Sequence, residues 1–321
     1  MTDVRTNQPA GMAMMIAAYL LWAIFPLYFA FISEAGAFEI AAHRIVWTFL
    51  FCLAGIVVVT FLRSRRRTAD SDDGERPPRI GLRDIIADRR LRTRLVIAGV
   101  FVTLNWLIYA GAVITGHTVD AALGYFINPL VTVLFAVLFL GERLRPLQIA
   151  ALGICLVAVV VMVIGYGQFP WIGLALALTF GMYSFIKYGV PSTIPPLASL
   201  ASETALLSPI AFCYLVFLQA TGASHFLGFS TDYTIALALS GVITAAPLLC
   251  FAYGASRLPL TTVGLIQYVC PIGQFAIGVW VFGEPMPLAR WIGFALIWVA
   301  LVFLSTDALL RVRRSREHVA A

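Results

Sequence analysis

About ten apolar runs of roughly 20 residues each, joined by short connections, make up most of this 321-residue sequence. An α-helix of about 20 apolar residues crosses the roughly 30 Å hydrocarbon core of a membrane. The runs show no period-2 alternation, which excludes a membrane β-barrel. With 61% hydrophobic and 12% charged residues, the chain is also too apolar for a soluble domain. The sequence therefore predicts an all-α integral membrane protein, with spans near residues 11–32, 39–62, 95–115, 119–140, 146–165, 170–188, 197–219, 233–254, 260–282 and 288–306.

A proline-containing stretch occurs twice in the chain, at residues 120–130 and 262–272. In both copies the proline predicts a broken or kinked helix, and a Gly-Glu pair follows it at the same distance. Pro129 aligns with Pro271, Gly141 with Gly283 and Glu142 with Glu284. Membrane helices are rich in Leu, Gly and Pro, so some self-similarity arises without duplication, but three non-aliphatic positions in one register favour a true repeat. Paired, interrupted spans of this kind point to the binding site of a transporter.

Arginines are concentrated in two parts of the chain. The segment 63–94 and the C-terminal tail hold most of them, whereas the connections expected on the opposite side of the membrane hold almost none beyond Arg290. By the positive-inside rule, we expect that segment and both termini to be cytoplasmic. Ten spans fit this distribution, and five spans per half is an odd number, so the two halves would be inverted in the membrane. The net charge of +6 thus reflects topology and does not indicate nucleic-acid binding.

We therefore expect a multi-pass protein of the inner membrane, built from two inverted five-helix repeats at 1–165 and 166–306. A charged cytoplasmic loop at 63–94 lies inside the first repeat, and a basic cytoplasmic tail follows at 307–321. Part of the loop, residues 82–91, has the composition of a short interfacial helix held by anionic lipid. No substrate role is assigned to this loop.

A polar face opens the second predicted span. Glu39, His43 and Trp47 are spaced four residues apart and share one helix face, with Arg44 beside it. Arg44 lies about a turn and a half inside the helix, where a charge costs about 2.5–3.5 kcal/mol even on insertion scales. Such a charge is expected to face protein or water. The alternative is that Arg44 extends its side chain to the outer headgroups.

The second half carries one lysine and one acid at membrane depth. Lys187, the single lysine of the chain, lies near the cytoplasmic end of its span, and Glu203 lies about two turns into the next one. A Lys187–Glu203 ion pair, or a Glu203 that faces an internal cavity, is the second site hypothesis. Glu203 is the strongest carboxylate candidate for proton coupling, because acids inside membrane helices often belong to proton relays. A purely structural pair, or simple anchoring of Lys187 at the cytoplasmic side, is the alternative.

Polar groups also accompany the later prolines. Pro247 predicts a kink in the eighth span, and Gln267 and Tyr268 lie beside the break expected at Pro271. Polar side chains next to an interrupted helix suit contact with a ligand. Hydrogen bonding between helices is the other explanation for the same groups.

Taken together, these motifs resemble the EamA-type families of the drug/metabolite transporter superfamily, and more narrowly its RarD-type branch. The resemblance covers nearly the whole chain apart from the tail and the charged loop. The motifs that carry it are Glu39-Ile-Ala-Ala-His-Arg-Ile-Val-Trp47, Asn105-Trp106, Leu123-Gly-Tyr-Phe-Ile-Asn-Pro-Leu130, Thr244-Ala-Ala-Pro-Leu-Leu249 and Leu265-Ile-Gln-Tyr-Val-Cys-Pro271. Cys270 departs from the pattern, since a small residue such as alanine is expected there.

The resemblance implies a permease with a central cavity between helices 1–4 and 6–9, and with helices 5 and 10 at the periphery. RarD-type proteins are linked by name to chloramphenicol sensitivity, and many relatives export amino acids or other small metabolites. The residues we assign to the cavity are Glu39, His43, Arg44, Asn105, Trp106, Tyr125, Asn128, Pro129, Lys187, Glu203, Pro247, Gln267, Tyr268 and Pro271.

The favoured function is a secondary transporter of a small organic metabolite or drug that works by alternating access. Proton coupling through Glu203 or Glu39 is one option, and uniport is the other. An integral-membrane enzyme acting on a lipid-linked group is the alternative, although the four histidines are scattered and most acids fall in loops. A channel or scaffold is disfavoured by the paired helix breaks. We expect no catalytic residue, metal or cofactor, and the sequence holds no phosphate-binding loop for ATP.

Overall fold

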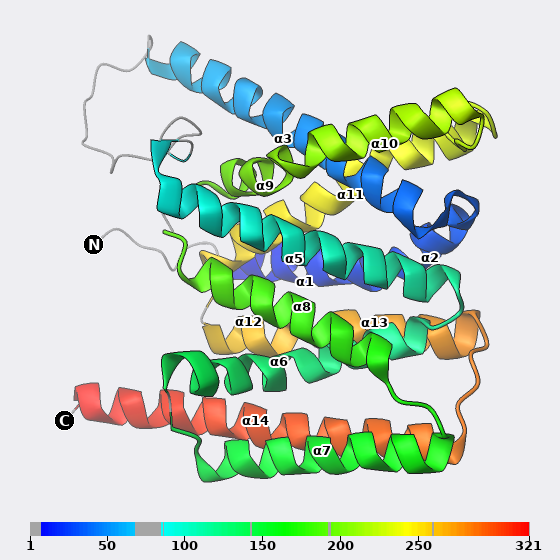
Figure 1. Ribbon diagram of the computed structural model, residues 1–321. Helices are drawn as coiled ribbons and strands as arrows, with labels where there is room; N and C mark the ends of the chain where they lie inside the picture. Colours follow the sequence, from blue (N-terminus) through cyan, green and yellow to red (C-terminus); the bar gives the residue numbers. More distant parts are fainter. Residues whose placement is uncertain are drawn as a thin grey trace. The chain divides into compact units, whose positions relative to one another are not determined.

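The computed structural model describes residues 8–67, 85, 87–141, 143–191, 194–258 and 260–320, and these residues form helices and short connections without any strand (Figure 1). The elements are α1 (Gln8–Ala23), α2 (Phe25–Phe31), η1 (Ser33–Ala35), α3 (Gly36–Arg67), α5 (Arg89–Ile114), α6 (Thr118–Leu140), α7 (Pro146–Tyr166), α8 (Trp171–Tyr188), α9 (Pro196–Ala205), α10 (Leu207–Thr221), α11 (Thr231–Ala255), α12 (Leu260–Ile266), α13 (Val269–Ala276), η2 (Ile277–Val281) and α14 (Leu288–Ala320). The prediction of an all-α chain is confirmed.

Within the described residues, eight helical stretches are long and apolar enough to cross a membrane. The bent pair α9 and α10, which meet at 55°, adds a ninth if the pair is one span. A further apolar helix, Trp171–Lys187, is shorter than the others. The multi-pass character of the chain is therefore clear, while the count of ten spans stays a prediction.

Helices extend into both ends of the segment predicted as a charged cytoplasmic loop at 63–94, and its cytoplasmic location stays a prediction. Helix α3 continues to Arg67, and α5 already begins at Arg89. Arginine is a good helix former, so a run of arginines extends a membrane helix into the polar region instead of ending it. Residues 68–84 and 86 lie outside the described ranges, and they include residues 82–84 and 86 of the interfacial segment predicted at 82–91.

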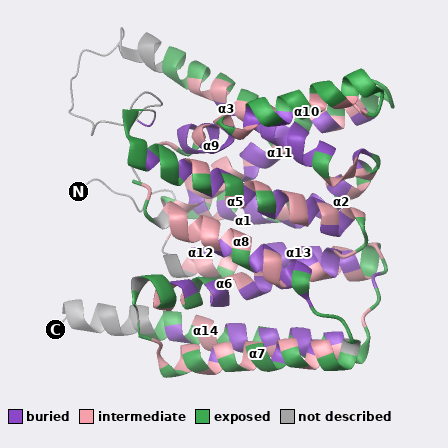
Figure 2. Ribbon diagram, viewed as in Figure 1, coloured by how far each residue is buried: buried purple, intermediate pink, exposed green. Residues whose placement is uncertain are grey.

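The chain divides into two compact units. Unit 1 comprises residues up to Phe31 together with Ile108–Met182 and Cys250–Ala321, and unit 2 comprises Ile32–Leu107 and Tyr183–Leu249. In unit 1, α1 packs against α13, α13 against α6, and α7 against α14 (Figure 1). Figure 2 shows exposed residues along α7 and α14, and many of these are large and apolar, as expected for helices that face lipid.

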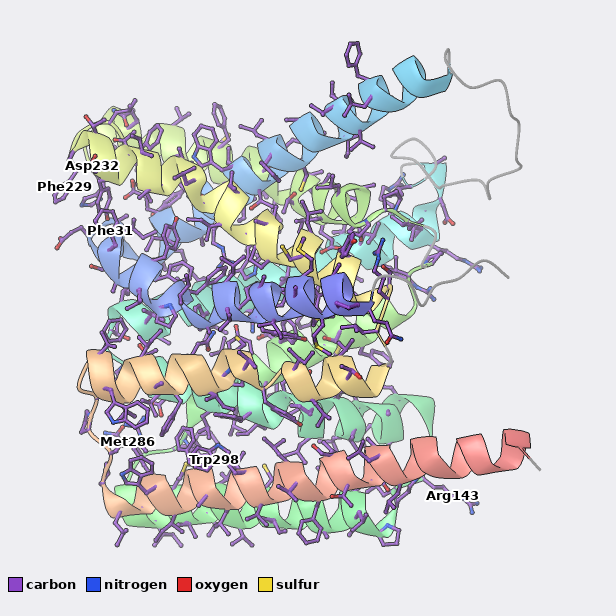
Figure 3. All side chains as sticks on the ribbon, turned by 180° about the vertical axis from the view of Figure 1, so that it is seen from behind. Phe31, Arg143, Phe229, Asp232, Met286 and Trp298 are labelled. Carbon is purple, nitrogen blue, oxygen red and sulfur yellow. The ribbon has the colours of Figure 1, made fainter. Side chains whose placement is uncertain are left out.

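Aromatic rings fill part of the core of unit 1. Phe275 of α13 contacts Trp291, Phe294 and Trp298 of α14, with ring centroids 4.8–5.7 Å apart. Phe126 of α6 meets Phe294 and Trp298 at 6.2 Å (Figure 3 labels Trp298). Because aromatic pairs of this kind add to the free energy gained by burial, they join α6, α13 and α14 into one block.

In unit 2, α3 packs against α9 and α10. Its core includes Ile45 and Cys52 of α3, Val102 and Trp106 of α5, and Leu200 of α9. Two glycines permit the close helix crossings. A methyl group on Gly99 of α5 would collide with the Glu203 carbonyl of α9, and one on Gly241 of α11 would collide with the Trp47 carbonyl of α3. Glycine at these crossings lets helix backbones approach as small residues do in other membrane proteins.

The repeated prolines have different consequences in the two copies. Helix α6 is continuous through Pro129, and α11 is continuous through Pro247, so neither proline breaks its helix. The second copy is broken, because α12 ends at Ile266 and α13 begins at Val269, just before Pro271. Gly141 and Gly283 nevertheless share a left-handed backbone, with φ of 67° and 66°, after the respective helices. Glu142 lies outside the described residues.

Glu284 binds the start of helix α6, a contact that could not be predicted from the sequence. Its buried carboxylate accepts hydrogen bonds from the backbone N–H groups of Thr118 (2.5 Å) and Val119 (2.9 Å), at the start of α6. These N–H groups have no partner within the helix, and a negative charge at a helix N-terminus is favourable. Arg290 lies nearby and donates to Asp120 at 2.6 Å and to the Pro285 carbonyl at 2.8 Å.

A second proline breaks the first predicted span. Helix α1 ends at Ala23, and α2 begins at Phe25, next to Pro26. Proline has no N–H, so Pro26 leaves the carbonyl of Trp22, four residues earlier, without its helical donor. The side chain of Gln274 in α13 fills this gap, since its Nε2 donates to the Trp22 carbonyl at 3.1 Å. Gln274 also donates to Cys270 Sγ at 3.3 Å and is almost fully buried.

This contact can be tested by a double-mutant cycle. We expect Gln274→Leu to lower the free energy of unfolding by about 1–3 kcal/mol. Among the described residues, Gln274 is the one side chain that donates to the Trp22 carbonyl, and without it this carbonyl would lie unpaired in apolar surroundings. In a Pro26→Ala background, residue 26 regains an N–H for that carbonyl, so the same substitution should cost less. Thermal and denaturant unfolding of the purified protein in detergent would measure both.

The exposed Gln219 of α10 provides the control, and Gln219→Leu should change stability by less than about 0.5 kcal/mol. An equal cost of Gln274→Leu with and without Pro26 would contradict this account of the break.

Candidate functional site

Glu203 is the centre of a buried polar group in unit 2. Its carboxylate is 1% exposed, and three side chains contact it. Lys187 Nζ lies 2.6 Å from Oε1, the Ser199 hydroxyl donates to Oε1 at 2.8 Å, and the Tyr183 hydroxyl donates to Oε2 at 3.2 Å. Lys187 also donates to Ser199 at 2.5 Å. Both carboxylate oxygens therefore have donors, and the lysine brings a compensating positive charge.

Helix spacing explains why these residues meet. Tyr183 and Lys187 are four residues apart on α8, and Ser199 and Glu203 are four residues apart on α9, so each pair presents one face. The predicted Lys187–Glu203 ion pair is present. Sequence analysis did not single out Tyr183 or Ser199 as partners, although their spacing from Lys187 and Glu203 is a signal that could have identified them.

Arg44 is the second charged side chain inside unit 2. It is 5% exposed, its Nε donates to the Thr244 hydroxyl at 2.9 Å, and its guanidinium lies 4.4 Å from the centre of the Trp106 ring. Contact with an aromatic face lowers the cost of a desolvated cation. Arg44 therefore faces protein, and the alternative that it reaches the outer headgroups is wrong. Thr244, three residues before Pro247, is a partner that the sequence analysis quoted only as part of a motif.

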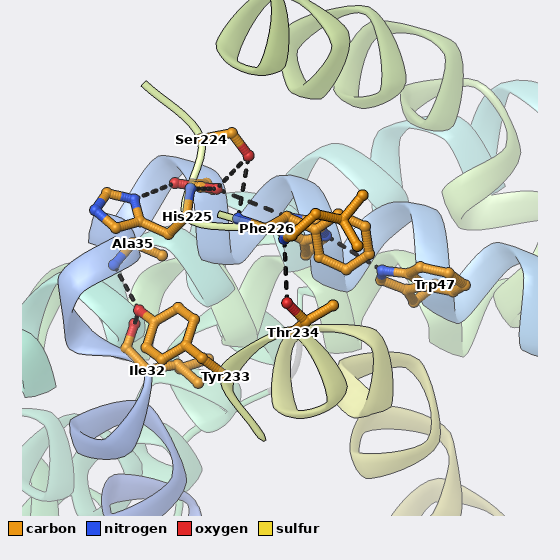
Figure 4. A network of polar contacts seen from close by, with 11 residues as sticks. Ile32, Ala35, Trp47, Ser224, His225, Phe226, Tyr233 and Thr234 are labelled. Atoms are coloured by element: carbon orange, nitrogen blue, oxygen red, sulfur yellow. Dashed lines mark hydrogen bonds and ion pairs between the residues drawn. The ribbon is translucent and has the colours of Figure 1, made fainter. Parts of the chain in front are cut away.

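Glu39 anchors the connection between α10 and α11. Its carboxylate is 3% exposed and accepts from the His225 backbone N–H at 2.9 Å and from the Ser224 hydroxyl at 3.2 Å, while His225 Nδ1 lies 2.9 Å from Oε2 (Figure 4). The hydroxyl of Tyr233 in α11 completes the contact, because it donates to the Ile32 carbonyl and accepts from the Ala35 N–H, both at 2.7 Å. These bonds fix the connection to the start of α3.

His43 continues this network along α3. The Trp47 indole Nε1–H donates to His43 Nδ1 at 3.2 Å, so a neutral His43 carries its proton on Nε2. Phe226 covers the imidazole at a ring distance of 4.8 Å. Nε2 is buried 3.9 Å from Glu39 Oε1, which is longer than a hydrogen bond, and no other group in the described part of the chain bonds to it. Glu39, His43 and Trp47 thus share one face as predicted, whereas Arg44 points to α5 and α11.

The remaining candidates in unit 2 and those in unit 1 have varied surroundings. Asn105 is buried in α5 beside Trp106. In unit 1, Tyr125 of α6 lies between Tyr109 and Phe180, at ring distances of 5.7 and 6.1 Å. Asn128 Oδ1 is buried with no hydrogen-bond partner among the described residues.

The polar residues beside the second break have partners within unit 1. The Tyr268 side chain interacts with the side chains of Ser305 and Gln267. These polar groups therefore contribute at least partly to contacts between helices. Pro247 and Pro271 are buried, and Pro129 is half-buried. Their assignment to a cavity stays a prediction.

Metal ligands form no cluster in the described part of the chain: no three His, Cys, Asp or Glu residues there are placed to hold a metal ion.

Known proteins place this chain in a family. The family model described as "EamA-like transporter family" matches it twice, over residues 9–164 and 170–306. The chain belongs to the EamA-like transporter family. It is therefore a membrane transporter and not an enzyme, and its relatives within the EamA family include proteins named RarD.

Several EamA relatives align over nearly the whole chain. Protein RarD of Streptomyces exfoliatus is 41% identical over 98% of this chain and 94% of its own length, and the uncharacterized transporter YojE of Bacillus subtilis (strain 168) is 35% identical over 96% and 97%. A more distant relative, 25% identical over 95% and 96%, is the chloramphenicol-sensitive protein RarD of Pseudomonas aeruginosa. A crystal structure that is 20% identical matches 91% of this chain and 96% of its own with a TM-score of 0.53, which supports the fold alone.

The Glu39 anchor leads to a prediction about local stability. We expect Glu39→Ala to increase amide hydrogen exchange about tenfold or more in residues 222–230, because hydrogen bonds to a charged group contribute about 1.5–3 kcal/mol each. Hydrogen–deuterium exchange with mass spectrometry in detergent micelles would measure it. Glu34→Ala, at an exposed acid one turn earlier, is the matched control and should leave the segment unchanged. Equal protection in the Glu39 variant and wild type would rule out the anchor.

Proposed function

We propose that this EamA-family protein is an inner-membrane carrier that moves a small organic metabolite or drug outward by alternating access. In this proposal all ten apolar stretches cross the membrane, counting α9 and α10 as one bent span and α8 as a short one. The arginine distribution supports cytoplasmic termini. The outward direction of transport is proposed by analogy with other members of the family.

We propose that the two halves are inverted repeats. The double match to one family model and the common register of Pro129 with Pro271 support this. The left-handed glycines at the same offset support it as well. In carriers built from such repeats, alternating access arises when one part rocks against another around a binding site near the midplane. The polar candidates Arg44, Asn105, Trp106, Tyr125, Asn128, Gln267 and Tyr268, with His43 and Glu39, are the residues we propose to test for substrate contact.

The observation that carries the coupling proposal is the buried Glu203 carboxylate with its three donors. Ionised, Glu203 accepts from Lys187, Ser199 and Tyr183. A proton on Glu203 would convert one acceptor oxygen into a donor and remove the charge that holds Lys187. Protonation therefore changes the contacts between α8 and α9, as a proton-coupled carrier requires. Glu39 is the weaker coupling candidate, because its contacts already serve the anchor described above.

The carrier itself is tested by counterflow. Purified protein in proteoliposomes, preloaded with an unlabelled compound, should take up the labelled form saturably for one member of a panel of amino acids, amines and chloramphenicol. Chloramphenicol belongs to the panel because a relative's name carries it. Empty liposomes and protein inactivated by heat are the controls. No exchange of any compound by folded protein would leave the carrier without support.

A second experiment tests the role of Glu203 in proton coupling. We expect Glu203→Gln to abolish accumulation driven by a pH gradient while counterflow exchange continues, because glutamine keeps the hydrogen-bonding shape but cannot take up a proton. Removing one partner of a buried pair can cost about 3–5 kcal/mol. The double variant Lys187→Gln/Glu203→Gln removes both charges and should recover stability without recovering coupling. Glu34→Gln is the matched control. Unchanged pH-driven accumulation in the double variant would refute the role of Glu203.

A further inference from the structure

The N-terminal end of α5 presents a strongly basic surface. Arg89, Arg90, Arg92 and Arg94 are all exposed, and we call these four residues the α5 arginine surface. Leu91 and Leu95 are buried on the other side of the same two turns, against Ile194 and Ala198. At 100° per residue, the two leucines lie 40° apart, Arg89 and Arg90 lie on the opposite side of the helix, and Arg92 and Arg94 flank the leucines on either side. Arg89 and Arg90 therefore face away from the core of unit 2.

This surface is held in place. Asp88 Oδ1 accepts from the backbone N–H groups of Arg90 (2.8 Å) and Leu91 (3.1 Å), so the start of the helix is capped. Arg94 Nη1 donates to the Gly189 carbonyl at 2.6 Å, just after α8. Residues 88–94 hold four arginines and one acid, Asp88, so this end of the helix carries a net positive charge.

The α5 arginine surface lies where a membrane helix begins. Arg89–Ile114 is one of the stretches apolar enough to span the bilayer, and its apolar part starts at Leu95. The arginines are therefore at the level of the lipid headgroups. Guanidinium groups bind phosphate with paired, charge-assisted hydrogen bonds. A basic surface far from the apolar span would instead favour binding of a soluble polyanion.

From these observations we infer that the α5 arginine surface binds the phosphate headgroup of anionic phospholipid. Arg89 and Arg90 are the primary contacts, because Arg94 is engaged with Gly189. A lipid bound here would also lie close to Gly189, which follows α8 and is two residues beyond Lys187.

Native mass spectrometry of the full chain tests this inference directly. Wild-type protein in detergent, titrated with phosphatidylglycerol or with phosphatidylcholine of the same acyl chains, should retain phosphatidylglycerol preferentially. The double variant Arg89→Gln/Arg90→Gln should bind phosphatidylglycerol roughly 25-fold more weakly, or about fivefold for each arginine lost near a membrane surface. Phosphatidylcholine binding should not change.

Single variants provide a matched comparison. Arg90→Gln should weaken binding about fivefold, whereas Arg143→Gln, at an exposed arginine in unit 1, should weaken it less than twofold (Figure 3). A thermal melt without added lipid establishes that each variant is folded. Unchanged phosphatidylglycerol binding in the folded double variant overturns the inference. So does an equal loss in Arg143→Gln, or competition by glycerol phosphate at the same concentration as the lipid, which would assign the surface to a soluble phosphate.

Discussion

A backbone group without a hydrogen-bond partner costs several kcal/mol in hydrocarbon, and each irregular helix in this chain depends on how that cost is avoided. Pro26 takes the helical donor from the Trp22 carbonyl, and Gln274 replaces it from α13. The start of α6 has unpaired N–H groups, and the Glu284 carboxylate binds two of them. In both cases the partner comes from more than 160 residues away. The breaks in unit 1 can therefore exist only when the fold brings distant segments together.

Buried charged side chains in unit 2 need partners for the same reason as the unpaired backbone groups in unit 1. Among the described residues of unit 2, Glu203, Arg44 and Glu39 are buried and have partners matched to their chemistry: a lysine and two hydroxyls for Glu203, a hydroxyl and an indole face for Arg44, and a loop with a histidine for Glu39. A buried ion pair is weak evidence for stability, because apolar residues of the same volume often serve as well. A gain in stability is thus not needed to account for the Lys187–Glu203 pair, which agrees with the coupling role proposed for Glu203.

How far the sequence could predict this arrangement depends on the range of each contact. Apolar run length predicts the helices because it is a local property, and a proline within such a run, as at Pro26, is a local signal as well. The Lys187–Glu203 pair was also accessible, since neighbouring spans placed both residues at similar depth. The Gln274–Trp22 and Glu39–His225 contacts could not be predicted, because nothing local distinguishes a glutamine or histidine that meets its partner from one that does not. At Pro129 a broken or kinked helix was expected, and α6 is continuous through this residue.

The two copies of the repeated stretch share a proline and a left-handed glycine, and they differ in the side chains next to the proline. Proline and the left-handed glycine occur in both, whereas Asn128 is replaced by Cys270 and Tyr125 by Gln267 at the equivalent positions. The first copy forms one helix and the second forms two. The proline and the left-handed glycine are therefore the features that the two copies share, while the side chains next to the prolines differ. A substrate site built from both copies would therefore be asymmetric, with the amide of Asn128 and the phenol of Tyr125 from the first copy and the amide of Gln267 and the thiol of Cys270 from the second. Such a site can distinguish the two ends of an asymmetric organic molecule, because its hydrogen-bond donors and acceptors differ from one side to the other.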